Sequence, residues 1–371
     1  MPHKNQSGPQ QWFFGWAVLL AVTYSLFIGA GAVFYAMSVL LRAIIAETGF
    51  SVAQISTATT IFLTTGGLAG IAIGELISRY DARYVVSIGS VIIVMSFWLL
   101  PEISSLTSIY FTYILLGLGY SMTALVPATT IVARWFVRRR ALAIALTQSG
   151  LSLGGILLTP ILANMLDTDG LEALRHPYLL AAILFNIPLV ILLMRPSPQS
   201  MGQHPDGDKI ASADDNPHNM GLLAAQALRS RFFLWCALAA ICTLLVQVGT
   251  IAHIYNWGLE RANPSMAAIT VASLAFSSMI GRLVCGFILH RINLFYFALS
   301  IYSIQAIAAL GMAMAQGTML VLVATICFGI TVGNGLMAQP LLIGAAFGGR
   351  DFARILSYHQ LVMNIGVAAG P

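Results

Sequence analysis

The apolar residues of this chain form long continuous runs, and short polar segments separate these runs. Runs of 18 or more apolar residues recur about every thirty residues, and each could cross a hydrocarbon core of roughly 30 Å as a helix. Lipid permits only helices or closed barrels, and continuous instead of alternating apolarity favours helices. The pattern therefore predicts an all-α membrane protein with eleven spans, near residues 13–41, 53–77, 84–101, 106–133, 141–166, 177–194, 231–258, 265–289, 293–315, 318–346 and 353–371.

Composition and the N-terminal segment support this prediction. Of the 371 residues, 58% are apolar and 8% are charged, whereas soluble domains carry roughly 25% charged residues. The first apolar run follows MPHKNQSGPQQW, is about twice the length of a signal-peptide core and has no small-residue cleavage site near its end. We expect the first helix to remain in the mature protein.

The distribution of basic residues predicts the orientation of the spans. If the N-terminus is cytoplasmic, fourteen of the eighteen Lys and Arg residues lie on that side, and only Arg42, Arg175 and Arg261 lie on the other. The positive-inside rule then predicts a cytoplasmic N-terminus, in the plasma membrane or the inner membrane of a bacterium. The basic residues are spread over short loops, which argues against a nucleic-acid partner, and the cluster Arg138–Arg140 is expected to contact membrane lipid.

A polar segment divides the spans into two groups. PSPQSMGQHPDGDKIASADDNPHNMG, between the sixth and seventh spans, is rich in Pro, Ser, Gly and Asp and cannot bury apolar surface. We therefore assign residues 1–195 to an N-terminal six-helix bundle, residues 196–228 to a cytoplasmic linker, and residues 229–371 to a C-terminal bundle.

A short motif recurs after the second and the eighth spans, at the same place in each half. Each copy consists of a glycine, three residues, a polar residue and an arginine: Gly74, Ser78 and Arg79 in the first half, and Gly286, His290 and Arg291 in the second. Both halves begin on the same side of the membrane. The repeat is therefore expected to be parallel, with an axis along the membrane normal.

Six helices, a polar linker and a second set with the same loop motif resemble the major facilitator superfamily. Within it, the chain is similar to the branch that contains monocarboxylate transporters and the oxalate–formate antiporter. Four segments carry this resemblance: Gly15–Val18 (GWAV), PATTIVARWFVRRRALA (Pro127–Ala143), SGLSLGG in the fifth predicted span (141–166), and FSSMIGRLVCG in the eighth (265–289), and helix numbers below count these spans in chain order. The resemblance implies two pseudo-symmetric six-helix bundles, transport by alternating access, and a gating role for the repeated loop motif.

The chain departs from the family pattern in two places. The family places an Asp before the Arg of the helix 2–3 loop, where this chain has Ser78, and a Gly is usual where this chain has Asp81. The resemblance therefore does not extend to the charge relay attributed to that loop. The family has twelve helices, and by this resemblance the second bundle is incomplete, because the chain ends within helix 11.

Arg282 lies most clearly inside a span. An ionisable side chain there costs roughly 2.5–3.5 kcal/mol on insertion scales, which makes it a functional candidate. Arg282 is about 12 Å along the helix from His290, which is beyond comfortable reach for snorkelling. Ser278 and Gly286 lie on the same stripe, and small residues mark the side of a membrane helix that faces protein or a cavity.

A carboxylate is the partner that best matches Arg282, because a guanidinium binds it bidentately. No Asp or Glu lies clearly inside helices 7 to 11 to neutralise the arginine. The resemblance implies the same role, since the monocarboxylate family has an arginine here that is implicated in substrate anion binding. A structural ion or a backbone carbonyl as the partner remains the alternative.

Further candidates lie in the helices that line facilitator cavities by resemblance. His253, near the outer end of helix 7, could move a proton or donate a hydrogen bond to an anion, although a lone His is more often structural. The polar and aromatic candidates, each with packing as the alternative role, are Tyr24, Tyr35, Tyr120, Gln148 and Asn334. Glu75 and His359 are ionisable residues near span ends.

These features predict a secondary active transporter of a small organic anion, of monocarboxylate type, coupled to a proton or a counter-anion. The sequence contains no phosphate-binding loop, no metal-binding His pair and no nucleophile elbow, so we expect no enzyme activity, cofactor or metal site. We expect a monomer. The alternatives are an efflux transporter of apolar or drug-like compounds, and a non-transporting membrane protein or truncated relic.

Overall fold

The structure is a computed structural model that describes residues 12–207, 221–261 and 264–370. Within these residues the chain is helical and contains no β-strand. The helices of the first half are α1 (Gly15–Ser25), α2 (Ala32–Thr48), α3 (Val52–Arg79), α4 (Ala82–Leu99), α5 (Leu106–Thr123), α6 (Leu125–Trp135), α7 (Arg140–Leu153), α8 (Thr159–Asp169), α9 (Arg175–Leu180) and α10 (Ile187–Leu193). After them come α11 (Ala224–Leu228), α12 (Arg231–Arg261), α13 (Pro264–Ile288), α14 (Leu294–Met314), α15 (Thr318–Phe347) and α16 (Phe352–Ala369).

Each of the eleven predicted spans coincides with a helical segment, which confirms the all-α membrane architecture. Eight helices of the described residues are long and apolar enough to cross a membrane, and Gly15–Gly29 and Ala181–Leu193 are shorter apolar helices. Large apolar side chains such as Trp235, Phe276 and Leu310 are more than 60% exposed. This exposure is expected of helix faces that contact lipid.

Prolines explain why several spans consist of two helices. Two π-helical turns, Gly154–Leu158 and Ala181–Asn186, each end two residues before a proline, Pro160 or Pro188. Proline removes a backbone donor and disfavours regular helix before it, so the hydrogen-bond ladder shifts at these points. Pro127 has the same effect between α5 and α6, where Ala124 adopts an extended conformation.

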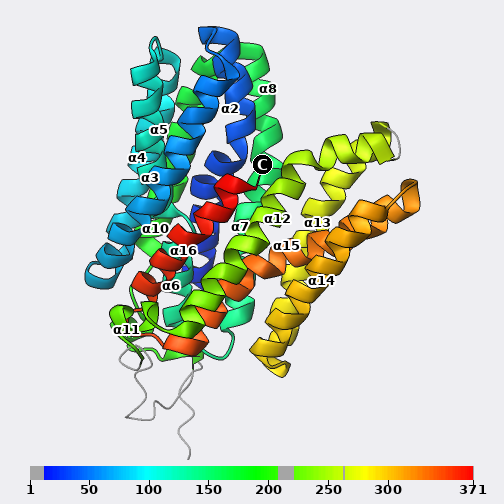
Figure 1. The fold of residues 1–371 in the computed structure, drawn as a ribbon. Helices are drawn as coiled ribbons and strands as arrows, with labels where there is room; N and C mark the ends of the chain where they lie inside the picture. Colours follow the sequence, from blue (N-terminus) through cyan, green and yellow to red (C-terminus); the bar gives the residue numbers. More distant parts are fainter. Residues whose placement is uncertain (1–11, 208–220, 262–263, 371) are drawn as a thin grey trace, which may run out of the picture.

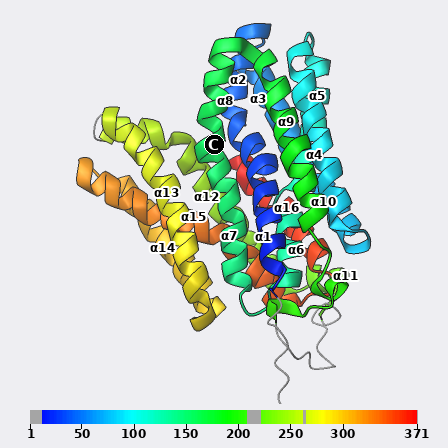
Figure 2. The ribbon, with the colours of Figure 1, turned by 180° about the vertical axis from the view of Figure 1, so that it is seen from behind.

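The helices form two groups (Figure 1). The first group comprises α1 to α10 and the second comprises α12 to α16, of which α16 packs against both α12 of its own group and α3 of the first. The two groups lie together at the end of the molecule that carries α11, and they diverge toward the opposite end (Figures 1 and 2). The domain boundaries predicted from the linker stay a prediction.

The two glycines of the repeated motif occupy equivalent contacts between the groups. A Cβ atom at Gly74 would overlap the side chain of Ser357 on α16, and one at Gly286 would lie 2.6 Å from Cβ of Ala145 on α7. Each glycine therefore allows its own helix, α3 or α13, to approach a helix of the other group. The remaining motif residues bond locally, as Ser78 donates to the carbonyl of Glu75 (2.7 Å) and the Nε of Arg291 donates to His290 (3.1 Å).

Candidate functional site

A cavity of about 530 Å³ lies between the two groups of helices. The first group contributes residues of α2, α3, α5, α6 and α7, and the other wall comes from α12, α15 and α16. The site is therefore assembled from both halves of the chain. A solute bound there would contact both halves at once, as alternating access requires.

Aromatic rings and glycines shape the cavity wall that the first group contributes. The ring of Tyr120 packs against Phe62 and Phe34, with ring centroids 5.2 Å and 6.2 Å apart. Gly66 and Gly70 on α3 leave space in front of these rings, and a Cβ atom at Gly70 would meet no heavy atom within 4 Å. The wall is therefore filled by rings where Tyr120 packs and recessed at the glycines.

The cavity lining is mainly apolar, and no charged side chain is among the described residues that form it. Its polar members are Tyr120, Ser121, Gln247, Gln360 and Asn364. Gln247 is held in place because its Nε2 donates to Oε1 of the buried Gln305 (3.0 Å). Such a surface suits a solute with an apolar body that forms a few hydrogen bonds.

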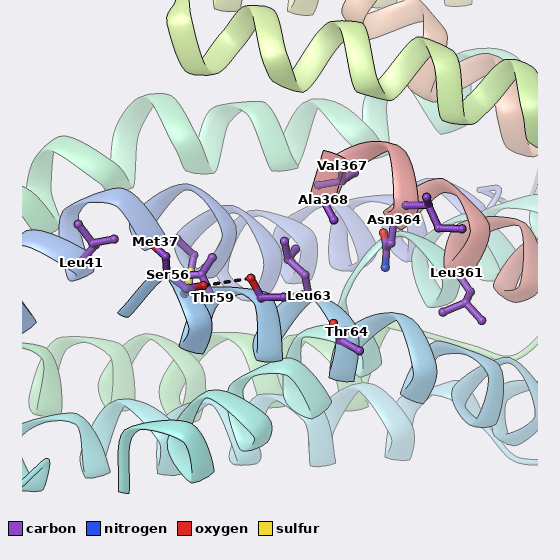
Figure 3. Close-up of a pocket in the computed structure, with 12 residues that line it drawn as sticks. Met37, Leu41, Ser56, Thr59, Leu63, Thr64, Leu361, Asn364, Val367 and Ala368 are labelled. Atoms are coloured by element: carbon purple, nitrogen blue, oxygen red, sulfur yellow. Dashed lines mark hydrogen bonds between the residues drawn. The ribbon is translucent and has the colours of Figure 1, made fainter. Parts of the chain in front are cut away.

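A second cavity of about 590 Å³ continues the first one along α2, α3 and α16 (Figure 3). The two cavities share Met37, Leu63, Asn364 and Val367. The α3 side carries hydroxyl groups, and the Thr60 hydroxyl donates to the carbonyl of Ser56 at 3.1 Å. The lining of this second cavity is therefore more polar than that of the central cavity.

Arg282 is almost fully buried, with 2% of its surface exposed, at the contact between α7, α13 and α15. Its Nη1 donates to the backbone carbonyl of Gln148 (2.7 Å), which lies in the other group of helices, and its Nε donates to the carbonyl of Gly333 (3.1 Å). Arg282 is not part of the cavity lining. In this conformation the arginine links the two halves through backbone carbonyls, the alternative that the sequence left open.

Three predicted site residues come together around this link. Gln148 is buried on α7, and its Nε2 donates to the carbonyl of Leu336 (3.4 Å), a residue that lines the cavity. Asn334 is fully buried on α15, next to the Gly333 carbonyl that Arg282 contacts. Arg282 and Gln148 thus form a polar link next to the cavity wall, and Asn334 lies beside this link on α15, where its Nδ2 donates to the carbonyl of Ile330 (2.8 Å).

The other predicted site residues have different placements. Tyr120 lines the cavity, whereas Tyr24 is half-buried against Phe27 and His253 is exposed on α12, and neither belongs to the lining. The side chain of Tyr35 lies outside the described part of the structure. The substrate-binding roles of these residues stay predictions.

Glu75 acquires a role that sequence reasoning did not assign to it. It lies next to Gly74, and its carboxylate forms ion pairs with Arg79 on its own helix and with Arg354 on α16. The pair with Arg354 crosses between the two groups, close to the place where the family pattern has an Asp and this chain has Ser78. The signal in the sequence was its position: Glu75 is an ionisable residue near the end of a span, directly after the glycine of the repeated motif.

Comparison with known proteins identifies the family. The family model described as Major Facilitator Superfamily matches residues 18–371. An MFS-type transporter of Gibberella moniliformis is 26% identical over 84% of this chain and 70% of its own length, and human monocarboxylate transporter 11 is 28% identical over 80% and 63%. The Fujikurins efflux protein of Gibberella fujikuroi is 25% identical over 64% of this chain and 49% of its own length.

Solved structures support the same fold. The fucose:proton symporter of Escherichia coli superposes with a TM-score of 0.67, at 16% identity, over 95% of this chain and 88% of the symporter. A structure of FucP in the outward conformation superposes with a TM-score of 0.65 over 96% of this chain and 90% of that chain. The fold, the cavity between two groups of helices and the match over residues 18–371 lead to one conclusion: this chain belongs to the major facilitator superfamily of transporters.

Proposed function

We propose that this chain is a secondary transporter that carries a small organic solute with a mainly apolar body through the cavity between its two halves. The uncharged, aromatic lining of that cavity is the observation that supports this proposal. Burial of apolar surface contributes about 25 cal/mol per Å², so such a site binds through the body of the solute. A solute gradient or a coupled proton or counter-anion supplies the energy.

We further propose that the solute is an organic monoacid and that Arg282 receives its carboxylate. Arg282 is buried behind the cavity wall, and its Nη1 bond to Gln148 crosses between the halves. Rocking of the halves would break this bond and turn the guanidinium toward a solute, and a charge-assisted bond to a carboxylate is stronger than a bond to a neutral carbonyl. The monocarboxylate transporter among the relatives supports this form of the proposal.

The second candidate substrate is an uncharged apolar compound, exported from the cell. The cavity lining favours it, because no described lining residue could neutralise a charged group directly. The efflux protein among the relatives is in agreement. The two candidates differ in one respect, which is the contribution of the acidic group to binding.

The orientation follows from the predicted charge distribution. We propose that the end carrying α11 is cytoplasmic, because the excess of basic residues lies there. The two groups lie together at that end and diverge at the other (Figure 1). On this proposal the structure represents a state that is open to the outside.

A binding series on the purified chain separates the candidates. Affinity is measured by thermal stabilisation for benzoate, benzamide and lactate, in the original chain, in Arg282→Gln, and in Arg42→Gln as an exposed-arginine control. The monoacid proposal expects benzoate to bind about tenfold more tightly than both benzamide and lactate, and to lose this advantage only in Arg282→Gln. Equal binding of benzoate and benzamide would support the uncharged candidate, and no binding in the series would overturn both.

A further inference from the structure

A third cavity, of about 450 Å³, lies at the end of the molecule that carries α11, away from the transport cavity. Its walls come from both groups of helices and from the segment after α10. Thr130, Arg134 and Arg140 contribute from the first group, Ser197 from the segment after α10, and Arg350 and Asp351 from the loop between α15 and α16. A ligand in this cavity would bridge the two halves where they lie closest.

The cavity carries an excess of positive charge. Arg134 donates to the backbone carbonyl of Ile77 (3.0 Å), and Arg140 donates to that of Ala133 (3.2 Å). Neither these two arginines nor Arg350 forms an ion pair with a carboxylate in the part of the chain that the structure describes. Backbone carbonyls orient the guanidinium groups, and the carboxylates of Asp81 and Asp206, which are outside the lining, attract Arg134 and Arg140 without forming an ion pair.

The acidic residue of the lining is already engaged. The carboxylate of Asp351 accepts a hydrogen bond from the backbone N–H of Ala224 (2.8 Å) and lies 3.6 Å from Nη1 of Arg354. Three arginines therefore face one carboxylate whose oxygens have other partners. The cavity retains the capacity to bind an anion with more than one oxygen.

Thr130 supplies an independent sign of a missing ligand. Its side chain is 3% exposed and lines the cavity, and its hydroxyl has no hydrogen-bond partner among the described residues. A helical threonine usually donates to the carbonyl four residues earlier, as Thr129 does to Leu125 at 2.6 Å. A buried hydroxyl without a partner is costly, and an acceptor oxygen in the cavity would satisfy it.

We propose that this cavity binds a phosphate group, which contacts the arginines of both halves and accepts a hydrogen bond from Thr130. Guanidinium groups match phosphate oxygens bidentately, and several oxygens are needed to engage groups on different walls. The phosphate belongs either to the headgroup of an anionic phospholipid or to free inorganic phosphate. Because the ligand contacts both halves, it stabilises the conformation in which they lie together at this end.

The test measures phosphate binding to the purified full-length chain in an uncharged detergent. Inorganic phosphate, short-chain phosphatidic acid and short-chain phosphatidylcholine are titrated at matched ionic strength, since exposed charges are screened by salt. The variants are Arg350→Gln, which removes an exposed arginine of the cavity, and Thr130→Val, which removes the hydroxyl at nearly constant volume. Arg229→Gln, an exposed arginine at the same end but outside the lining, is the matched control.

We expect Arg350→Gln and Thr130→Val each to weaken binding by about tenfold and Arg229→Gln to leave it unchanged. The amides of residues 349–353 should also exchange more slowly with solvent when the ligand is bound. Binding of inorganic phosphate identifies the free ion as a sufficient ligand, and binding of phosphatidic acid alone identifies the lipid headgroup. Absence of binding to both, or binding that neither cavity variant weakens, overturns the proposal.

Discussion

The ion pair between Glu75 and Arg354 is expected to hold the two halves together at the end that carries α11. The Nη2 of Arg354 donates to Oε1 of Glu75 and its Nε forms an ion pair with Oε2, so two atoms of each side chain are in contact and the pair crosses from α16 to α3. Replacement of either residue by glutamine should shift the protein away from the conformation described here. The opposite end of the molecule would close as a result.

The magnitude follows from the exposure of the pair. Both side chains are 32% exposed, and ion pairs that retain access to water are weak, so loss of this pair is expected to change the ratio of the two conformations by roughly two- to fivefold. The two contacts between guanidinium and carboxylate favour the upper part of this range. A change of this size is large enough to measure.

The assay is a double-mutant cycle read by pulsed electron spin resonance. Spin labels at positions 52 and 316, which are exposed at the end where the halves diverge, report the distance between the halves after the four native cysteines are replaced. Glu75→Gln, Arg354→Gln and their combination are compared with the original chain. Arg79→Gln is the control, because Arg79 pairs with Glu75 within the same helix.

We expect both single variants to populate the shorter distance about equally, and the double variant to add little to either. The Arg79→Gln control should leave the distance distribution nearly unchanged. Additive effects of Glu75→Gln and Arg354→Gln would refute the reasoning, because they would mean that the two side chains act independently. An effect of Arg79→Gln as large as that of Arg354→Gln would refute it as well.

Three further predictions test the cavity, the packing between the halves and the core. Gly70→Leu should reduce solute uptake into proteoliposomes with little loss of stability, because the new leucine side chain would enter the open cavity. The control is Gly311→Leu, which should leave uptake unchanged, because Gly311 is exposed outside the cavity lining and a Cβ atom there also meets no neighbour within 4 Å. Gly286→Val should destabilise the packing of the halves by about 1–3 kcal/mol and shorten the same spin-label distance, and an unchanged distance would contradict the packing argument. Trp135→Phe should lower the free energy of unfolding by about 1–2 kcal/mol, because the buried indole N–H donates to a backbone carbonyl at 3.0 Å, while Trp235→Phe on the exposed surface should have no measurable effect in a thermal melt.

The helices were predictable from the sequence because each membrane span must satisfy its own backbone within lipid. All eleven predicted spans coincide with helical segments, and the family predicted from four motifs is confirmed by a match over residues 18–371. The breaks within the helical spans were harder to predict. The break at Ala124 depends on Pro127, which is close in sequence. The position of Ala124 in the cavity lining depends instead on how α5 and α6 pack.

The site was only partly predictable, because its geometry depends on residues far apart in the chain. The small-residue stripe beside Arg282 indicated that the arginine faces protein, and its side chain is indeed buried. The stripe could not identify Gln148, 134 positions away, as the residue whose carbonyl it contacts. Likewise, Glu75 was visible as an ionisable residue near a span end, while its partner Arg354 lies 279 positions later.

The eleven spans, the family and the duplicated motif with its two glycines could all be predicted from the sequence. These properties are local, since the length of an apolar run, the position of a proline and a short repeated motif each involve residues within a few turns of one helix. Three features could be seen only in the folded chain: no charged residue lines the central cavity, Arg282 lies outside its lining, and three arginines and a threonine without a hydrogen-bond partner among the described residues line a separate cavity. Those properties depend on the relative placement of two helix groups, because each cavity is formed by side chains that meet only when both halves are packed together.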